Sequence, residues 1–337
     1  MREGLSFVDV CAGGGGLALG AERAGFEARM LLEVEPKAVE TLRSNRPHWD
    51  VLQGDLLEFD PDEYRSAQDV DLLLAGLPRV KSNATITRAS SETEIRLVRA
   101  TVFLAHSVQP RALVIENVPG LVESDNFAPL REFAYAELEH LGYVLHWFVL
   151  NAADFGVPQD RKQGILVAIK EPWDRGFEIP RPSSSPPTSV GQALAHSMAS
   201  RGWTGAEQWA AQATKVAPTL VGGSDKRGGA DLGPRGSKAA WAKIGVYAGS
   251  LGDEAPGPDF VWAPDLGKEH MLQITVEQAA ILQGFPDDWV FRGGKTVRYR
   301  QIGHASPPPV GAALARSVAD ALTGRRSRAG YTSSSAT

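Results

Sequence analysis

Two polar residues follow apolar segments that are typical of buried strands, and their side chains could do chemistry. Arg79 comes after the apolar run 70–75 and a Gly/Pro turn, and Glu116 follows the apolar segment 111–115. In a doubly wound α/β sheet the functional groups lie just beyond the carboxyl ends of the strands, so the Glu116 carboxylate can face the Arg79 turn. A guanidinium stays protonated and has no free lone pair. Arg79 could therefore bind a phosphate or a base edge, or pair with Glu116, but it could not act as a nucleophile.

A glycine-rich turn near the N-terminus indicates a nucleotide-like cofactor. The apolar strand 6–10 leads into Gly13 and its neighbouring glycines, then into a helix over 17–24 and a second strand over 26–34. Glycines at such a turn let the backbone approach a ligand closely, and Glu33, 20 positions after Gly13, stands where a carboxylate can bind ribose hydroxyls. Asp55 could accept a hydrogen bond from an adenine amino group or could simply cap its own loop. Cys11 beside the glycines is expected to be a packing residue.

The remaining segments predict an α/β domain interrupted by a smaller one. Helices are expected over 97–108, 128–141 and 311–322, with strands over 111–115, 143–150 and 164–169 and a polar loop over 81–99. Thr275 and Gln278 form a capping-box pattern for a helix that stops at Gly284. The Pro/Ser-rich stretch 180–187 is typical of a linker. We therefore expect a large domain from 1–180 plus 269–324, a small irregular domain over 181–268, and a disordered tail over 325–337.

Composition favours a soluble protein of ordinary type. The 337 residues are 43% hydrophobic and 22% charged, with a net charge of −5. No long apolar run or leader pattern is present, so neither a membrane span nor a membrane partner is expected and the cytoplasm is the default location. The single cysteine leaves no intrachain disulfide and no thiolate cluster, and no metal site is predicted. Basic residues gather over 215–243 and 292–300, which favours a polyanion partner. The candidate DNA-binding residues are Lys226, Arg227, Arg235, Lys238 and Arg298.

Taken in order, these segments resemble the DNA cytosine-5 methyltransferase family over nearly the whole chain. The matching motifs are Asp9-Val10-Cys11-Ala12-Gly13-Gly14-Gly15-Gly16, Glu33, Gly54-Asp55, Gly76-Leu77-Pro78, Glu116-Asn117-Val118, Phe155-Gly156-Val157-Pro158-Gln159-Asp160-Arg161, Leu282-Gln283-Gly284-Phe285-Pro286-Asp287-Asp288, Gln301-Ile302-Gly303 and Pro307-Pro308-Pro309-Val310. The resemblance implies a Rossmann-like domain that binds S-adenosylmethionine, and a small target-recognition domain that reads duplex DNA.

The chemistry implied by the resemblance is base flipping followed by covalent catalysis. A cysteine thiolate adds to C6 of cytosine while a glutamate contacts N3, and C5 then takes the methyl group. By resemblance Glu116 is the N3 carboxylate and Arg161 positions the base or a phosphate. The implied cofactor-binding residues are Asp9, Cys11, Gly13, Gly15, Glu33, Asp55, Pro78 and Ser306.

The departures from the family pattern lie around the base-binding motifs. Arg79 stands where the family has its cysteine, and its distance of 37 positions from Glu116 indicates a substitution in place. Gln163 replaces a usual second arginine, His304 replaces an asparagine, and Ser306 also differs. We therefore expect a protein that binds cofactor and DNA but is inactive or altered in C5 methylation, with a regulatory, partner-subunit or DNA-binding role. The alternatives are an active enzyme with assisted chemistry, or another cofactor-dependent reaction on a nucleobase or small molecule. The sequence alone does not distinguish a natural from an engineered Arg79.

Overall fold

The protein is built around one seven-stranded sheet, and the computed structural model describes residues 4–80, 92–222 and 229–324. Part of the expected 81–99 loop, Lys226, Arg227 and the tail 325–337 lie outside the described residues. The strand order is β3-β2-β1-β4-β5-β8-β6. Neighbouring strands are parallel from β3 to β5, whereas β8 runs antiparallel to both β5 and β6. The strands are β1 (Leu5–Val10), β2 (Phe26–Glu33), β3 (Val51–Gln53), β4 (Leu72–Gly76), β5 (Ala112–Asn117), β6 (Tyr143–Asn151) and β8 (Lys162–Lys170).

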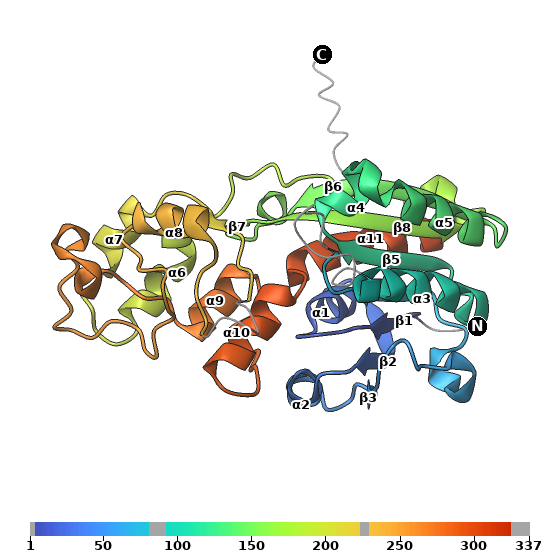
Figure 1. Cartoon of the computed structure of the whole chain (residues 1–337), viewed down its shortest axis with the longest axis horizontal. Coiled ribbons are helices and arrows are strands. Elements are labelled where there is room, and N and C mark those ends of the chain that lie inside the picture. Colours follow the sequence, from blue (N-terminus) through green and yellow to red (C-terminus); the bar gives the residue numbers. More distant parts are fainter. Residues whose placement is uncertain (1–3, 81–91, 223–228, 325–337) are drawn as a thin grey trace, which may run out of the picture.

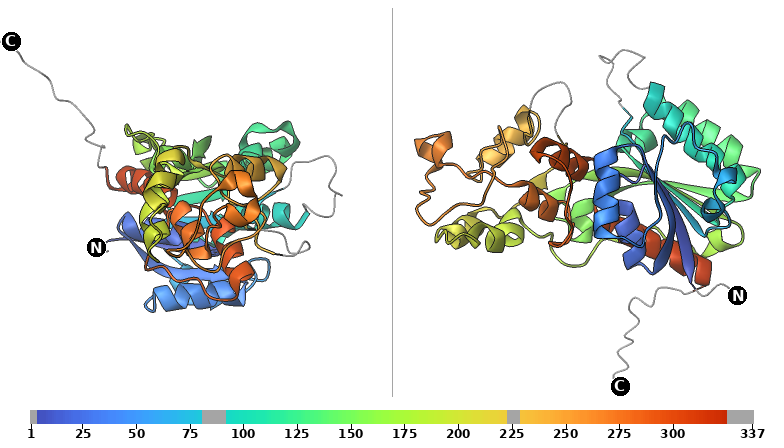
Figure 2. Two further views of the ribbon diagram at one scale, coloured as in Figure 1. Left: turned by 90° about the vertical axis from the view of Figure 1, so that its left-hand side faces the viewer. Right: turned by 90° about the horizontal axis from the view of Figure 1, so that it is seen from below.

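Alternation along the strands divides the core into two layers, as expected for a sheet covered on both faces. Leu74 and Val114 belong to the core on one face, which the helices α1 (Gly16–Arg23) and α11 (Pro308–Thr323) help to build. Leu73 and Leu113 belong to the core on the other face, beneath α3 (Glu92–Val108) and α5 (Ala128–Glu139). Figure 2 shows helices on both sides of the strands. Glu116 lies two residues beyond Val114, so its side chain leaves the sheet on the α1/α11 face.

The C-terminal segment returns to pack against the start of the chain. Helices α1 and α11 lie in close contact, and a Cβ atom on Gly16 would collide with the carbonyl oxygen of Ser306. A Cβ on Gly20 would lie 2.5 Å from the backbone nitrogen of Ala312. Glycine at these positions therefore lets the two segments approach to backbone contact, which brings the Ser306 region beside the glycine turn.

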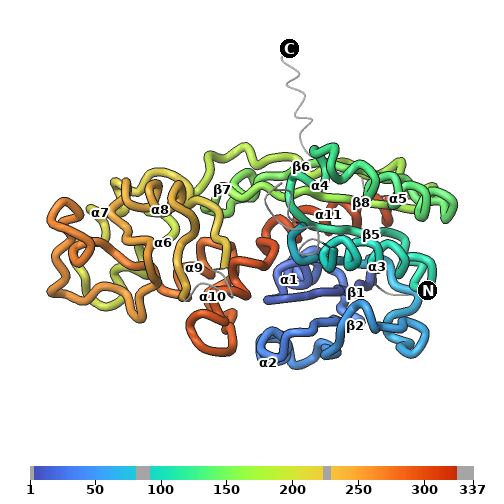
Figure 3. The backbone as a smooth tube through the Cα atoms, viewed as in Figure 1, coloured from blue at the N-terminus to red at the C-terminus, as the bar shows by residue number. Residues whose placement is uncertain are grey.

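Residues 181–268 form a lobe at one end of the molecule, separate from the sheet in the views of Figures 1 and 3. The described residues of this lobe contain three α-helices, where the sequence predicted an irregular structure. Ser189 and Gln192 form a capping box at the start of the first helix, and Trp209 and Trp241 are completely buried within the lobe. Buried indoles supply the apolar area that a short, non-periodic sequence otherwise lacks. The helices are α6 (Val190–Ala199), α7 (Ala206–Gln212) and α8 (Arg235–Ala242), and β7 (Gln159–Asp160) pairs with β9 (Ala217–Pro218).

Some helix boundaries also differ from those expected. Helix α3 begins at Glu92 and not at 97, and α11 begins at Pro308 because proline fits the first turn of a helix. The basic segment 292–300 lies largely in α10 (Lys295–His304), whose buried residues include the polar Gln301 and the small Gly303, so the sequence shows no clear apolar helical pattern there. The capping box at Thr275 and Gln278 is confirmed. The other helices are α2 (Pro36–Asn45), α4 (Pro119–Glu123) and α9 (Val276–Leu282).

Candidate active site

The glycine turn after β1 adopts backbone conformations that favour glycine. Gly13 and Gly15 have φ values of 54° and 86°, both in the left-handed region. The backbone N–H of Gly13 donates to Glu33 Oε2 at 2.6 Å, and the Trp289 indole donates to the carbonyl of Gly14 at 3.2 Å. A Cβ on Gly14 would lie 2.9 Å from the ring of Phe291. The turn is thus held between the end of β2 and an aromatic segment near the C-terminus.

Asp9 is the most unusual group near this turn. The side chain is 1% exposed, and its carboxylate oxygens lack a hydrogen-bond partner of good geometry, although the backbone N–H of Ala18 lies near enough to oppose the rise in their pKa. Burial, followed by the negative charge of Glu33, raises the pKa of Asp9 to about 8. A buried polar group without a partner is costly. A ligand that donates hydrogen bonds or carries positive charge would relieve that cost.

The other residues assigned to the cofactor lie around the same edge. Burial raises the pKa of Glu33, whose oxygens accept from the backbone of Gly13 and Glu35. Asp55 is exposed and its Oδ1 accepts from the Leu57 N–H at 2.9 Å, so it does cap its own loop. Burial and the neighbouring carboxylates raise the pKa of the Cys11 thiol, which keeps this side chain protonated and suits the packing role.

The side chain of Asn117 attaches the Arg79 turn to the end of β5. Asn117 Oδ1 accepts from the backbone N–H of Val80 at 3.0 Å, and its Nδ2 donates to the carbonyl of Pro78 at 3.2 Å. Pro78 itself is exposed and Arg79 is partly exposed. In the sheet Gly76 is the register partner of Glu116. The Arg79 turn therefore follows directly after the register partner of Glu116 and is bonded to Asn117, the residue after Glu116.

Glu116, Arg161 and Gln163 surround this turn with buried polar atoms that lack partners. Their exposed fractions are 3%, 0% and 0%. Glu116 Oε1, Arg161 Nε and Gln163 Oε1 have no hydrogen-bond partner. Burial lowers the pKa of Arg161 to about 9, with a second contribution from the charge of Arg79 and an opposing one from Glu116. We call Arg79, Glu116, Arg161 and Gln163 the sheet-edge site.

Arg161 also has a structural task that its sequence motif does not reveal. Its Nη1 donates to the carbonyl of Leu220 at 2.9 Å and its Nη2 to that of Ala305 at 3.1 Å. Each terminal nitrogen thus donates to a backbone carbonyl, and Nε has no hydrogen-bond partner. Gln163 donates to the Ser306 hydroxyl at 2.8 Å, which places the cofactor candidate Ser306 beside the sheet-edge site.

Asn117 and Gln159 hold the surroundings of the site in place, and the sequence assigned neither of them a role. Gln159 donates to Gln283 Oε1 at 2.7 Å and accepts from the Leu220 N–H at 2.9 Å. Both residues lie inside the motifs that carry the family resemblance. Their place in these motifs was the only sequence feature that could have pointed to them.

The candidate DNA-binding residues inside the described part are mostly paired with acids. Lys238 Nζ lies 2.7 Å from Asp231 Oδ2, and Arg298 Nη1 lies 2.6 Å from Glu277 Oε1. Arg235 is exposed at the start of α8. Exposed pairs of this kind are weak, so phosphates can compete for their cations.

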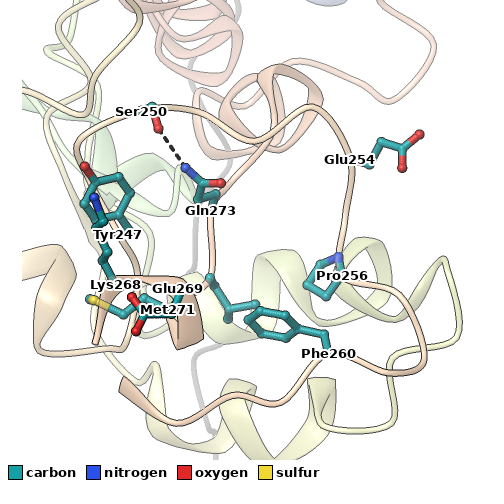
Figure 4. Close-up of a pocket in the computed structure, with 10 residues that line it drawn as sticks. Tyr247, Ser250, Glu254, Pro256, Phe260, Lys268, Glu269, Met271 and Gln273 are labelled. Atoms are coloured by element: carbon teal, nitrogen blue, oxygen red, sulfur yellow. Dashed lines mark hydrogen bonds between the residues drawn. The ribbon is translucent and has the colours of Figure 1, made fainter. Parts of the chain in front are cut away.

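A separate cavity of about 500 Å³ lies in and beside the 181–268 lobe (Figure 4). Its walls carry the aromatic ring of Phe260, the charges of Lys268 and Glu269, and Gln273, which donates to Ser250 at 2.7 Å. It shares no residue with the sheet-edge site. Among the described residues no cluster of His, Cys, Asp or Glu is suited to a metal ion, and none of their helices could cross a membrane.

With this geometry established, comparison with known proteins defines the class. The model of the C-5 cytosine-specific DNA methylase family matches residues 5–320, so the chain belongs to that family. Its relatives include the type II methyltransferase M.NaeI of Lentzea aerocolonigenes, with 42% identity over 95% of this chain and 76% of that protein. The type II methyltransferase M.NgoMIV of Neisseria gonorrhoeae is 37% identical over 94% of this chain and 97% of that protein.

Solved structures show the same fold at lower identity. A DNA modification methyltransferase encoded within an Escherichia coli prophage has a TM-score of 0.66 and 20% identity, over 95% of this chain and 99% of that one. The Dnmt2 methyltransferase of S. pombe gives 0.61 and 15%, over the same fractions. The expected Rossmann-like α/β methyltransferase fold is therefore confirmed. The family uses S-adenosylmethionine and acts on DNA.

Proposed function

We propose that this protein binds S-adenosylmethionine and duplex DNA but does not methylate cytosine C5 through a covalent cysteine intermediate. The observation that carries the proposal is the position of Arg79. Its two neighbours in the chain are hydrogen-bonded to Asn117, directly beside Glu116. In the family's mechanism the residue at this position attacks C6 of the pyrimidine ring. A guanidinium has no lone pair with which to do so.

The residues around the glycine turn fit the proposed cofactor. The buried Asp9 and Glu33 carboxyls place oxygens where ribose hydroxyls would be bound, and a nearby sulfonium cation would lower the raised pKa of Asp9. The left-handed glycines keep side chains away from the same space. When bound, S-adenosylmethionine would supply an activated methyl group. Asp9, Glu33 and the glycine turn would bind and orient it.

Cys11 does not replace the missing nucleophile in this proposal. Its pKa is raised by burial and by three neighbouring carboxylates, so thiolate is disfavoured. It follows β1, whereas the Arg79 turn follows β4, the neighbouring strand. An assisted reaction would therefore need a nucleophile from another molecule, and a partner subunit could supply one.

The test uses the purified full chain, tritiated S-adenosylmethionine and mixed-sequence duplex DNA. We expect calorimetry to detect cofactor binding and a shift assay to detect DNA binding, while tritium transfer to C5 stays at background. Arg79→Cys should restore transfer if the rest of the site is sound. C5 methylation by the unaltered protein alone would refute the proposal, as would a failure to bind either cofactor or DNA.

A further inference from the structure

The sheet-edge site contains three buried polar atoms that have no hydrogen-bond partner. Two of them are acceptors, Glu116 Oε1 and Gln163 Oε1, and one is a donor, Arg161 Nε. All three belong to side chains that are at most 3% exposed. Native proteins seldom leave buried polar atoms unpaired, and each carries a desolvation cost of about 1–3 kcal/mol. A polar molecule bound at this end of the sheet would give these atoms partners.

The three groups reach the same place because of the sheet register. Glu116 pairs with Ile165 across β5 and β8, and Gln163 is two residues from Ile165, on the same face. Arg79, which is partly exposed and whose charge acts on Arg161, adds five N–H donors. The site thus combines two buried acceptors with a partly exposed arginine fork.

This combination excludes the simplest charged ligands. A phosphate or carboxylate would be stabilised by Arg79 but would face the oxygens of Glu116 and Gln163. A metal cation would face the guanidinium groups of Arg79 and Arg161. A neutral ring with donors on one part of its edge and acceptors on another can pair with both buried acceptors and with an arginine fork.

Resting on the proposed binding of DNA, we propose that the sheet-edge site takes up an unpaired guanine base in place of the cytosine used by the family. Guanine alone among the four DNA bases has hydrogen donors at two ring positions, N1–H and the 2-amino group, which match the two buried acceptors. Its O6 and N7 acceptors match an arginine fork, the commonest specific contact between an arginine and a base. Cytosine and adenine each offer a single amino group.

The experiment measures binding of fluorescently labelled single-stranded oligothymidine that carries one central guanine, cytosine or adenine. We expect the guanine oligomer to bind the full-length protein about tenfold more tightly than the cytosine one, within the range for a bidentate base contact. Replacing guanine by inosine, which lacks the 2-amino group, or by 7-deazaguanine, which lacks N7, should remove much of the preference.

Variants assign the preference to the site. Arg79→Cys and Glu116→Gln should each abolish the guanine preference, whereas Arg65→Cys, which removes the same charge from an exposed turn, should leave it intact. Equal affinity for guanine and cytosine oligomers, or a preference that survives Arg79→Cys, would overturn the inference while leaving the proposed function standing. Absence of binding to any oligomer and to duplex DNA would overturn both.

Discussion

A few side chains decide whether the fold can carry out the chemistry of its family. In the proposed function Arg79 takes the place of the family's nucleophile and Asp9 lies at the cofactor end, while Asn117 holds the backbone on both sides of Arg79. Asp9 is a buried carboxyl with a raised pKa, which is typical of functional sites.

Asp9 should make stability depend on pH. In the unfolded chain the pKa of an aspartate is about 3.9, whereas in the folded protein burial raises it to about 8. Between these values the folded state holds a proton that the unfolded chain has released. The free energy of unfolding should therefore fall as pH rises from 4 to 8, by up to about 1.4 kcal/mol per pH unit from this group.

Urea titrations at several pH values check this expectation. Asp9→Asn should flatten the slope, and Asp125→Asn, which changes an exposed carboxylate, should not. Parallel pH profiles for the unaltered protein and Asp9→Asn would show that Asp9 does not titrate in this window.

Asn117→Ala should loosen the Arg79 turn. The substitution removes the acceptor for the Val80 N–H and the donor to the Pro78 carbonyl, so we expect a loss of about 1–3 kcal/mol in the free energy of unfolding. Asn126→Ala, at an exposed position, should change stability by less than about 0.5 kcal/mol. Similar values for the two variants in chemical denaturation would contradict the role given to Asn117.

At the scale of elements, the ends of β4, β5 and β8 meet at one edge, and Arg161 connects that edge to two distant segments. Its guanidinium joins the carbonyl of Leu220, which follows β9, to that of Ala305, which follows α10. The orientation of the 181–268 lobe against the sheet thus depends on the buried guanidinium group of Arg161.

Arg161→Lys should destabilise the protein by at least about 2 kcal/mol, because an ammonium cannot reproduce a two-pronged contact with separated carbonyls. Arg131 offers a matched control: its Nη1 also donates to two carbonyls, Leu121 and Ser124, but within a local, partly exposed segment. Thermal unfolding should show a much smaller loss for Arg131→Lys. Equal losses would mean that Arg161 has no special role in joining the elements.

The sequence predicted the sheet better than the lobe, for physical reasons. Strands such as β4 and β5 are continuous apolar runs bounded by turns, and the register that brings Glu116 to the Arg79 turn follows from parallel pairing. The lobe is held instead by buried indoles such as Trp209 and Trp241, which leave no periodic pattern. The link from Arg161 to Leu220 joins residues 59 positions apart, and local sequence carries no signal for such a contact.

At the scale of the whole molecule, a net charge of −5 opposes binding to a polyanion, so local cations must compensate. Arg298 is held by Glu277 and Lys238 by Asp231. These ion pairs set how strongly the surface can attract phosphate.

Glu277→Gln should release Arg298 and tighten binding to mixed-sequence duplex DNA by about two- to fivefold at low salt, with a steeper salt dependence. Glu178→Gln, which releases the exposed Arg181 in the linker, removes the same charge and serves as the control. Titrations at two or more salt concentrations distinguish the variants. If both bind alike, Arg298 makes no contact with DNA phosphates.

The central claim is that a guanidinium at position 79 prevents the covalent bond to the pyrimidine ring while the rest of the fold is retained. Its most direct test is to incubate the protein with S-adenosylmethionine and mixed-sequence duplex DNA in which 5-fluorocytosine replaces cytosine, followed by denaturing electrophoresis. We predict no covalent adduct with the unaltered protein and an adduct with Arg79→Cys. A stable adduct formed by the unaltered protein would contradict this account.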